Sequence, residues 1–308
     1  MTPSGVSGSH LITESCPTGL RVIPRVAAVV GIAAVLAGSP ARARGQFSSG
    51  VNVVEVYATV TDRQGQPVKG LDRADFTVRE NGELQQVSTF AAGDFPLSVA
   101  VALDRSFSMS GQRLDTARSA ARIFLGELKA TDESMLIGVG STTEVLAPLT
   151  KDRAAQFDAL SRLDAFGTTG LYDAIIAAID LIQPARGRRA LVLLSDGSDR
   201  YSTASGAQAL EKARAADVLV YPIAFGPARA PVFAELASLT GGRSFHVRDA
   251  RQLPETVRSI AAELRHQYLL GYSPAKPPVP GSNEWRSIAV TVRRGDVTVR
   301  ARDGYLVK

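Results

Sequence analysis

The chain has 308 residues, of which 45% are hydrophobic and 21% are charged. This is the composition of a globular protein with a sizeable core, and it excludes disordered and collagen-like chains. The formal charge is +5, but the arginines are scattered and form no basic stripe interleaved with aromatic residues, so the sequence does not predict binding to nucleic acid.

The first 43 residues have the features of an export signal. Arg21 and Arg25 precede an uncharged apolar run over residues 26–38, and a small-x-small cleavage pattern follows at residues 41–43. The run is shorter than the roughly 20 apolar residues that span a bilayer. We therefore expect residues 1–43 to be a signal peptide, and the mature protein to be periplasmic or extracellular with no integral membrane segment. An uncleaved membrane anchor is the alternative.

Residues 50–94 are predicted to form a small β segment. Residues 51–62 alternate apolar and polar side chains and are rich in β-branched residues, which is typical of a strand. Two shorter strands are expected at residues 75–79 and 84–90. The Asn81-Gly82 pair between them favours a type I′ hairpin turn.

Residues 95–265 are predicted to alternate strands and helices. The uninterrupted apolar run over residues 97–103 predicts a strand that is buried on both faces of a parallel sheet. Further strands are expected at residues 135–140, 144–149, 190–195, 219–225 and 244–247. Helices are expected at residues 114–129, 153–163, 171–182, 204–216, 232–239 and 253–264. This alternation predicts a doubly wound, Rossmann-like α/β domain with a mostly parallel sheet.

Residues 266–308 return to β character. A strand is expected at residues 268–272, a hairpin of residues 287–293 with 297–302, and a last strand at residues 305–307. Because neither β segment has enough residues to bury a core alone, we expect the two to pack together as a small β-sandwich. Two separate β appendages are the alternative.

Three loops of the α/β segment carry oxygen ligands. Asp104, Ser106 and Ser108 directly follow the strand at 97–103, and Asp196 follows the strand at 190–195. A third loop offers the hydroxyl of Thr169 at a helix start. We expect all three loops to come from neighbouring strand ends, where ligands of open α/β sheets bind.

The chemistry of these side chains predicts a metal centre. Carboxylate and hydroxyl oxygens without histidine or cysteine suit Mg²⁺ first, with Mn²⁺ and Ca²⁺ as alternatives, and do not suit Zn²⁺. Two carboxylates are few for Mg²⁺, so waters and a ligand from outside should complete the coordination shell. The alternative for the first loop is helix capping, and for Asp196, which precedes a glycine, a turn.

These residues make the segment over 95–265 resemble the von Willebrand factor type A domains and their metal-ion-dependent adhesion site (MIDAS). That site consists of D-x-S-x-S, then a threonine, then an aspartate. Asp104, Ser106 and Ser108 match the first element, Thr169 the second and Asp196 the third. The resemblance implies that these residues bind the metal directly or through water, and that a Glu or Asp of a partner protein supplies the missing ligand.

Some residues depart from this pattern or leave it open. Thr168 precedes Thr169 and could take its place. Arg105 and Phe107 differ from the residues usual in the family. Neither difference removes an oxygen ligand, but both could change the choice of partner.

The flanks also carry a resemblance. Residues 58–62, 75–78 and 299–305 are similar to exported bacterial proteins of acidobacterial type, which are related to the type A family and have no assigned activity. This resemblance covers the chain from about residue 50.

The sequence therefore predicts an exported, metal-dependent protein-binding or adhesion module that is not an enzyme. A structural scaffold with a loop-stabilising metal is one alternative, and a metal-assisted hydrolase is another. A hydrolase would need a general base, for which Asp173 and Asp199 are the candidates near the cluster. We expect His246 and His266 to be structural.

Overall fold

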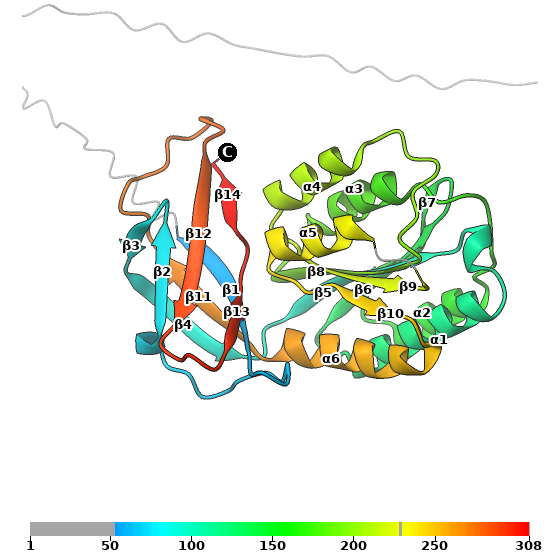
Figure 1. Cartoon of the computed structure of the whole chain (residues 1–308), viewed down its shortest axis with the longest axis horizontal. Coiled ribbons are helices and arrows are strands. Elements are labelled where there is room, and N and C mark those ends of the chain that lie inside the picture. Colours follow the sequence, from blue (N-terminus) through cyan, green and yellow to red (C-terminus); the bar gives the residue numbers. More distant parts are fainter. Residues whose placement is uncertain (1–52, 228–229, 308) are drawn as a thin grey trace, which may run out of the picture. The chain divides into compact units, whose positions relative to one another are not determined.

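The structure is a computed structural model, and it describes residues 53–227 and 230–307 (Figure 1). The predicted signal peptide at residues 1–43 lies outside the described residues. Within them, no helix is both long enough and apolar enough to cross a membrane.

A six-stranded sheet in the order β10-β9-β8-β5-β6-β7 forms the centre of the α/β part. Five strands run parallel, and the edge strand β7 runs antiparallel to β6. The strands are β5 (Leu97–Asp104), β6 (Glu133–Val139), β7 (Thr143–Thr150), β8 (Arg188–Ser195), β9 (Leu219–Phe225) and β10 (Phe245–Val247). The predicted doubly wound α/β domain with a mostly parallel sheet is thus confirmed.

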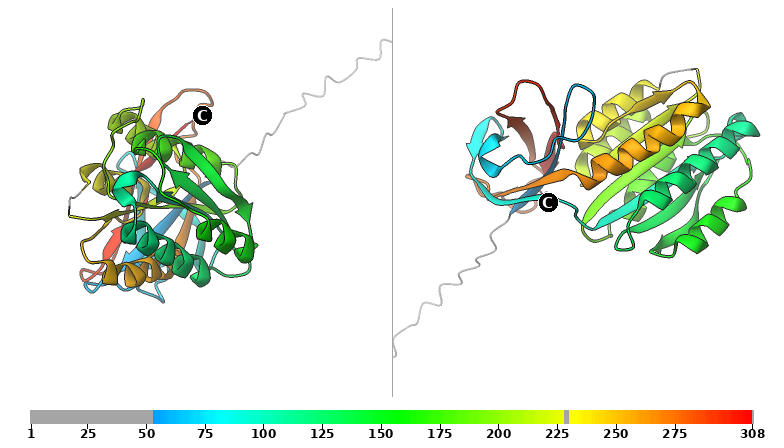
Figure 2. Two further views of the ribbon diagram at one scale, coloured as in Figure 1. Left: turned by 90° about the vertical axis from the view of Figure 1, so that its right-hand side faces the viewer. Right: turned by 90° about the horizontal axis from the view of Figure 1, so that it is seen from below.

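Helices cover both faces of this sheet (Figure 2). They are α1 (Gln112–Glu127), α2 (Arg153–Ser161), α3 (Leu171–Ile182), α4 (Gly206–Ala215), α5 (Pro231–Thr240) and α6 (Leu253–Arg265). Strand β5 shows how the two layers arise, because its side chains alternate between faces. Val101 and Leu103 pack into the core shared with α1, α2 and α6, whereas Ala100 and Ala102 pack into the core shared with α3, α4 and α5.

The flanking β segments form two antiparallel sheets of four strands, in the orders β13-β1-β11-β4 and β14-β12-β2-β3. The strands are β1 (Val54–Thr61), β2 (Phe76–Glu80), β3 (Glu83–Gln85), β4 (Val87–Gly93), β11 (Gln267–Tyr272), β12 (Trp285–Val292), β13 (Thr298–Arg300) and β14 (Gly304–Leu306). N-terminal β1 pairs with C-terminal β11, and β2 pairs with β12. Both segments therefore contribute to each sheet.

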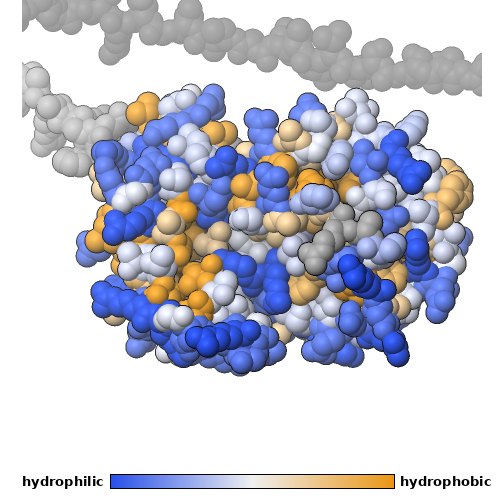
Figure 3. Space-filling view, viewed as in Figure 1, coloured by the Kyte–Doolittle hydropathy of each residue, from blue (hydrophilic) through white to orange (hydrophobic). Residues whose placement is uncertain are grey.

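One core fills the space between these two sheets. Val56 of β1 and Leu270 of β11 are buried together with Phe76 and Val78 of β2. The predicted β-sandwich of N- and C-terminal segments is therefore present, and we call it the β module. Hydrophobic side chains are visible near β12 and β13 (Figure 3). There Val290 and Val299 line a cleft of about 460 Å³ next to α5, together with charged side chains such as Arg300.

Two predicted details of the β module are wrong. The strands predicted at residues 287–293 and 297–302 do not pair as a hairpin, because β12 pairs with β2 and β14 while β13 pairs with β1 in the other sheet. The strand predicted at 84–90 is two strands, since β3 pairs with β2 and β4 pairs with β11. The chain changes sheets at both places, which a local pattern does not reveal. The Asn81-Gly82 hairpin is confirmed by the pairing of β2 with β3 and by positive φ at both residues.

A buried arginine links the α/β part to the β module. Arg188, at the start of β8, donates hydrogen bonds to Gln267 Oε1 and to the carbonyl of Phe95, where the chain leaves and enters the α/β part. Its guanidinium also lies over the rings of Tyr57 and Phe95. Burial lowers the pKa of Arg188 to about 10, which still keeps the side chain charged at neutral pH.

Candidate metal centre

Two neighbouring strands bring the acidic residues to the same edge of the sheet. β5 and β8 are adjacent and parallel, with Leu103 opposite Leu194. Asp104 is the last residue of β5, and Asp196 directly follows β8. Their placement agrees with the expectation that the site lies beyond the carboxyl ends of the strands.

The carboxylate of Asp104 is fully buried and is held from two sides. Its Oδ1 accepts a hydrogen bond of 2.9 Å from the backbone N–H of Ser106, and its Oδ2 accepts one of 2.6 Å from Ser195 Oγ. The short 3₁₀ helix over Phe107–Met109 then turns the chain back, and Met109 anchors it in the core. The first loop is thereby fixed at both its acidic and its hydroxyl positions.

The hydroxyls of the first loop reach across to the last loop. Ser106 Oγ lies 3.1 Å from Ser108 Oγ, and Ser108 Oγ donates a hydrogen bond of 2.7 Å to Asp196 Oδ2. The other oxygen of Asp196 accepts from the backbone N–H of Ser198. The side-chain oxygens of Ser106, Ser108 and Asp196 therefore form a hydrogen-bonded chain across the two loops.

The loop that carries Thr169 is tied to both other loops through its backbone. The carbonyl of Thr169 accepts hydrogen bonds from the N–H groups of Arg200 and Tyr201 in the last loop. The carbonyl of Gly167 accepts from Phe107 N–H at 3.0 Å in the first loop. Three loops far apart in the sequence are thus held against one another.

The middle loop carries two threonines and lies between two helices. Thr169 is only 2% exposed, whereas Thr168 is exposed to solvent, so the two candidate hydroxyls lie in different environments. The prediction that all three loops follow strand ends is wrong for this loop, which joins α2 to α3. A loop between two helices can still reach the edge of the sheet because α3 begins there, at Leu171.

The electrostatics of the site favour a bound cation. Burial raises the pKa of the Asp104 carboxyl above its ordinary value, the hydrogen bonds from Ser106 and Ser195 oppose this rise, and the charge of Asp196 adds to it. Among residues 53–227 and 230–307, no lysine, arginine or histidine forms an ion pair with either carboxylate. A divalent cation would relieve the repulsion between these two carboxylates.

The available donors fit Mg²⁺, Mn²⁺ or Ca²⁺ better than Zn²⁺. The set consists of two carboxylates with serine and threonine hydroxyls, which are all hard oxygen ligands. In the described part of the chain no cluster of three or more His, Cys, Asp or Glu side chains could hold a metal.

Asp173 and Asp199 hold the surrounding loops. Asp199 Oδ1 accepts from the N–H of Leu171 at the start of α3 and from Ser202 Oγ. The two oxygens of Asp173 accept from the N–H groups of Thr203 and Ala204.

The two histidines each contact the backbone. His246 Nε2 lies 2.9 Å from the carbonyl oxygen of Gly226, and His266 Nδ1 lies 2.8 Å from that of Ala262. These contacts fit the predicted structural role.

Sequence reasoning missed three residues of this region. Ser195 holds Asp104, and the only sequence signal was a hydroxyl beside Asp196. Phe166 and Tyr201 are aromatic residues on the middle and last loops whose side chains are exposed. An apolar residue in a polar loop was the available signal for both.

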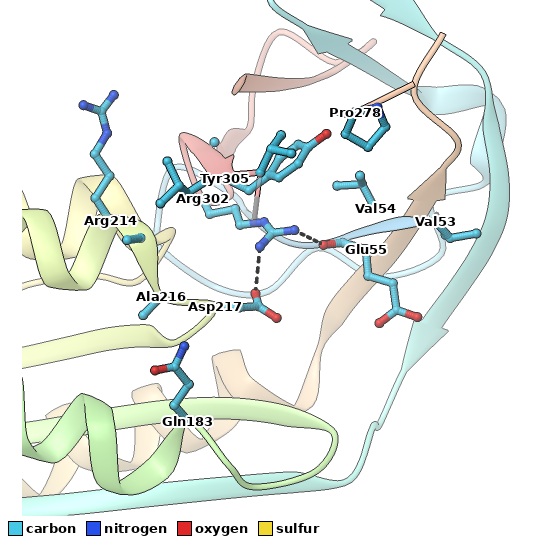
Figure 4. A pocket seen from close by; sticks show the side chains of 14 residues that line it. Val53, Val54, Glu55, Gln183, Arg214, Ala216, Asp217, Pro278, Arg302 and Tyr305 are labelled. Atoms are coloured by element: carbon cyan, nitrogen blue, oxygen red, sulfur yellow. Dashed lines mark hydrogen bonds and ion pairs between the residues drawn. The ribbon is translucent and has the colours of Figure 1, made fainter. Parts of the chain in front are cut away.

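A sizeable pocket lies away from the candidate metal centre. It has a volume of about 690 Å³ and is lined by β1, β14 and the residues before β9 (Figure 4). Because Asp217 precedes β9, the pocket lies at the amino ends of the parallel strands, whereas Asp104 lies at their carboxyl ends. Arg302 crosses it and donates hydrogen bonds to Asp217 Oδ1 and to the carbonyl of Glu55. Since these polar groups already pair with one another, we place the candidate site at the metal centre.

Comparison with known proteins identifies a related family. Residues 99–198, which run from β5 to the loop after β8, match the family model of the von Willebrand factor type A domain. Residues 99–198 of the α/β part are therefore similar to a von Willebrand factor type A domain.

One curated relative is a UPF0353 protein of Mycolicibacterium paratuberculosis. It is 27% identical over an alignment of 220 residues, and the alignment covers 60% of this chain and 62% of the relative. The match thus spans about three fifths of the length of that relative.

One solved structure shares the fold over most of the chain. A von Willebrand factor type A protein from Catenulispora acidiphila has a TM-score of 0.52 and 14% identity, and the match covers 84% of this chain and 75% of that one. This coverage is more than the α/β part can supply, so the likeness in fold reaches into the β module. BatB from Bacteroides thetaiotaomicron has a TM-score of 0.46 and 19% identity, with coverage of 54% of this chain and 98% of that one.

Proposed function

We propose that the protein is a metal-dependent protein-binding module, in which Asp104, Ser106, Ser108, Thr169 and Asp196 hold a divalent cation. Mg²⁺ is the first choice, with Mn²⁺ and Ca²⁺ as alternatives. The observation that carries the proposal is the contact between Ser108 Oγ and Asp196 Oδ2, which closes a set of oxygen ligands around two carboxylates without a basic partner in the described residues. The cation would offer a coordination position to an Asp or Glu side chain of a partner protein.

Each of the five site residues would have its own part in binding the cation. Asp104 and Asp196 would supply the negative charge that retains the cation, and the hydroxyls of Ser106, Ser108 and Thr169 would supply neutral oxygens. Because the two carboxylates neutralise the cation without filling its coordination shell, the cation could still accept a further carboxylate as a ligand.

The pairing of the nearby acids supports binding over catalysis. A metal-assisted hydrolase needs a general base that can reach a water molecule. Both oxygens of Asp173 accept backbone N–H groups, and Asp199 accepts from Leu171 N–H and from Ser202 Oγ. These hydrogen bonds commit the two carboxylates to holding the loops.

Calorimetry of the purified mature protein tests the metal site. We expect Mg²⁺ or Mn²⁺ to bind to the wild type and not to Asp104→Ala. Asp104→Asn keeps the shape of the buried side chain and removes only its charge, so it separates a loss of metal from a loss of folding. Unchanged binding in both folded variants would contradict the metal centre.

A capture experiment tests the partner. The immobilised protein is exposed to cell-envelope extract with Mg²⁺ or with a chelator, and the retained proteins are identified by mass spectrometry. We expect proteins that are retained by the wild type only with Mg²⁺ and not by Asp104→Asn. If the metal raises the melting temperature but no retained protein depends on it, the scaffold with a loop-stabilising metal replaces our proposal.

We also propose that the protein is exported, on the basis of the apolar run over residues 26–38 and the cleavage pattern at residues 41–43. Fractionation of the producing cells, followed by mass spectrometry of the intact protein, tests this. A mature chain that begins just after residue 43, outside the cytoplasm, is expected. A cytoplasmic chain that retains residues 1–43 would contradict export, and a membrane-bound one would indicate an uncleaved anchor.

A further inference from the structure

Each of the three loops of the candidate metal centre carries one exposed aromatic side chain. Phe107 lies between Ser106 and Ser108 and is 64% exposed, Phe166 precedes Thr169 in the middle loop and is 54% exposed, and Tyr201 follows Asp199 and is 62% exposed. Large aromatic side chains are usually buried, and exposed ones that gather at one place mark interaction surfaces.

Backbone hydrogen bonds hold the loops that carry these three residues against one another. Phe107 N–H donates to the carbonyl of Gly167, which directly follows Phe166. Phe166 N–H donates to the carbonyl of Arg105 at 2.7 Å, and Tyr201 N–H donates to that of Thr169 at 3.1 Å. The same bonds that hold the three loops of the candidate metal centre together therefore bring together three loops that each carry one exposed aromatic residue, and we call Phe107, Phe166 and Tyr201 the aromatic rim.

Arg105 holds one member of the rim in position. Its guanidinium lies over the ring of Phe166, 5.3 Å from the ring centroid, and pairs with Glu144 of β7 at 3.2 Å. A planar cation on an aromatic face is a favourable arrangement that limits the motion of the ring. Because a positioned ring loses less entropy on binding than a free one, Arg105 prepares the rim for a partner.

The charge around the rim indicates which partner fits. The proposed cation attracts a carboxylate, and the exposed guanidinium of Arg113, which donates to the carbonyl of Ser108, adds positive charge on the same loop. Around this centre, Phe107, Phe166 and Tyr201 add exposed aromatic surface beside polar side chains. Such an arrangement complements an acidic residue that has apolar neighbours.

We propose that the aromatic rim selects a protein segment in which an Asp or Glu is flanked by aromatic or aliphatic residues. This inference rests on the proposed function, because the acidic side chain would be the one that meets the cation. The flanking side chains would pack on Phe107, Phe166 and Tyr201, where aromatic contacts add to the affinity beyond the area they bury.

Two matched sets of short labelled peptides test this proposal by fluorescence anisotropy. Both sets carry a central glutamate and the same net charge, and the flanking residues are phenylalanine or leucine in one set and serine in the other. With Mg²⁺ we expect the wild type to bind the apolar-flanked peptides at least about tenfold more tightly than the serine-flanked ones. With a chelator both sets should lose binding.

Variants locate the preference on the rim. The triple variant Phe107→Ser, Phe166→Ser, Tyr201→Ser should bind both peptide sets equally, while its Mg²⁺ affinity by calorimetry stays that of the wild type. Leu84→Ser is the matched control, because Leu84 is also 64% exposed but lies on β3 of the β module. It should keep the preference for apolar flanks, and Asp104→Asn should lose binding of both sets.

The outcomes separate this inference from the function on which it rests. Mg²⁺-dependent binding of both peptide sets with equal affinity overturns the selective rim and leaves the proposed function standing. The absence of Mg²⁺-dependent binding to any peptide overturns both. Mg²⁺-dependent binding of polygalacturonate, an acidic polysaccharide, without discrimination between the peptide sets would overturn the rim's role in protein recognition, since aromatic rings also stack on sugars.

Discussion

The hydroxyl of Ser108 donates a hydrogen bond of 2.7 Å to Asp196 Oδ2, and this bond joins residues that are 88 positions apart in the sequence. It connects the loop after β5 with the loop after β8. The two strands are neighbours in the sheet, so their carboxyl ends place the two loops side by side. The candidate metal centre is thus a direct consequence of the strand order.

Ser195 gives a first prediction, because it supports the site without being a proposed ligand. Its hydroxyl donates to Asp104 Oδ2 at 2.6 Å and accepts from the N–H of Gly197. Residues that orient metal ligands typically contribute about 10–100-fold to affinity. We therefore expect Ser195→Ala to weaken Mg²⁺ binding by about this factor in calorimetry. Ser110→Ala, at an exposed position of the first loop, should change it little; equal effects of the two substitutions would argue against a specific role for Ser195.

The two adjacent threonines give a second prediction. Thr169 is buried at the meeting point of the loops, and Thr168 is exposed. Replacing threonine with valine removes a hydroxyl and keeps the branched shape. Thr169→Val should weaken Mg²⁺ affinity by at least about tenfold, because it removes a proposed oxygen ligand. Thr168→Val should leave the affinity unchanged, and the reverse order would assign the ligand to Thr168.

Gly167 gives a third prediction, on the geometry of the middle loop. Its φ of +72° is unfavourable for other residues, and an added Cβ would lie 2.6 Å from Ser141 Oγ. We expect Gly167→Ala to lower the free energy of unfolding by about 1–3 kcal/mol in urea denaturation. Because the loop carries Thr169, its Mg²⁺ affinity should fall as well.

Gly126 of α1 is the matched control for this substitution. An added Cβ there would meet nothing within 4 Å. Gly126→Ala should leave Mg²⁺ affinity unchanged and raise the free energy of unfolding by up to about 1 kcal/mol, since alanine favours helix. If Gly167→Ala changes stability and Mg²⁺ affinity no more than Gly126→Ala does, the positive φ of Gly167 is not required.

The sequence could predict the central domain because its signals are local. Each buried strand of the α/β part is a short apolar run, as over residues 97–103, and its helices have a regular apolar face. The positions of Asp104 and Asp196 followed from the ends of such runs. A buried parallel sheet therefore reveals both its strands and the edge where a site lies.

The β module was harder because its pairings are not local. Residues 287–293 and 297–302 look like a hairpin, yet the second strand pairs with β1, more than 200 positions earlier in the chain. Whether two nearby strands share a sheet depends on the packing of the whole sandwich. For the same reason, the hydrogen bond from Ser195 to Asp104 could be seen only once β5 and β8 were known to be neighbours.

The buried ion pair of the β module gives a fourth prediction. Arg286 Nη1 and Glu80 Oε1 lie 2.9 Å apart, and both side chains are buried. Breaking a buried ion pair typically costs about 3–5 kcal/mol, and the more exposed Glu284, 3.3 Å from Arg286, would remain as an acidic partner. We expect Glu80→Gln to lower the free energy of unfolding by this amount in urea denaturation.

Glu83→Gln is the control for this pair. Glu83 lies on β3 and pairs with Lys276 at the surface. Exposed ion pairs contribute about 0–1 kcal/mol. If the two substitutions have similar effects, the pair of Glu80 with Arg286 is not the stabilising element that its burial indicates.

The same carboxylate gives a last prediction, on stability at alkaline pH. The hydroxyls of Tyr272 and Tyr305 both donate to Glu80 Oε2, at 2.7 and 3.0 Å. Burial, the hydrogen bond to Glu80 and its negative charge together raise the pKa of Tyr305 to about 12, and the same causes raise the pKa of Tyr272.

The sign of the effect follows from the neutral form of the phenol. In the unfolded chain a tyrosine ionises near pH 10, so these residues contribute their full stability below about pH 10. Between about pH 10 and 12 the unfolded state loses the proton first, and the free energy of unfolding should fall. Urea denaturation at a series of pH values, with absorbance at 295 nm to follow ionisation, measures this. Tyr305→Phe cannot ionise and should show a shallower fall than the wild type; identical slopes would mean that Tyr305 ionises alike in the folded and unfolded states.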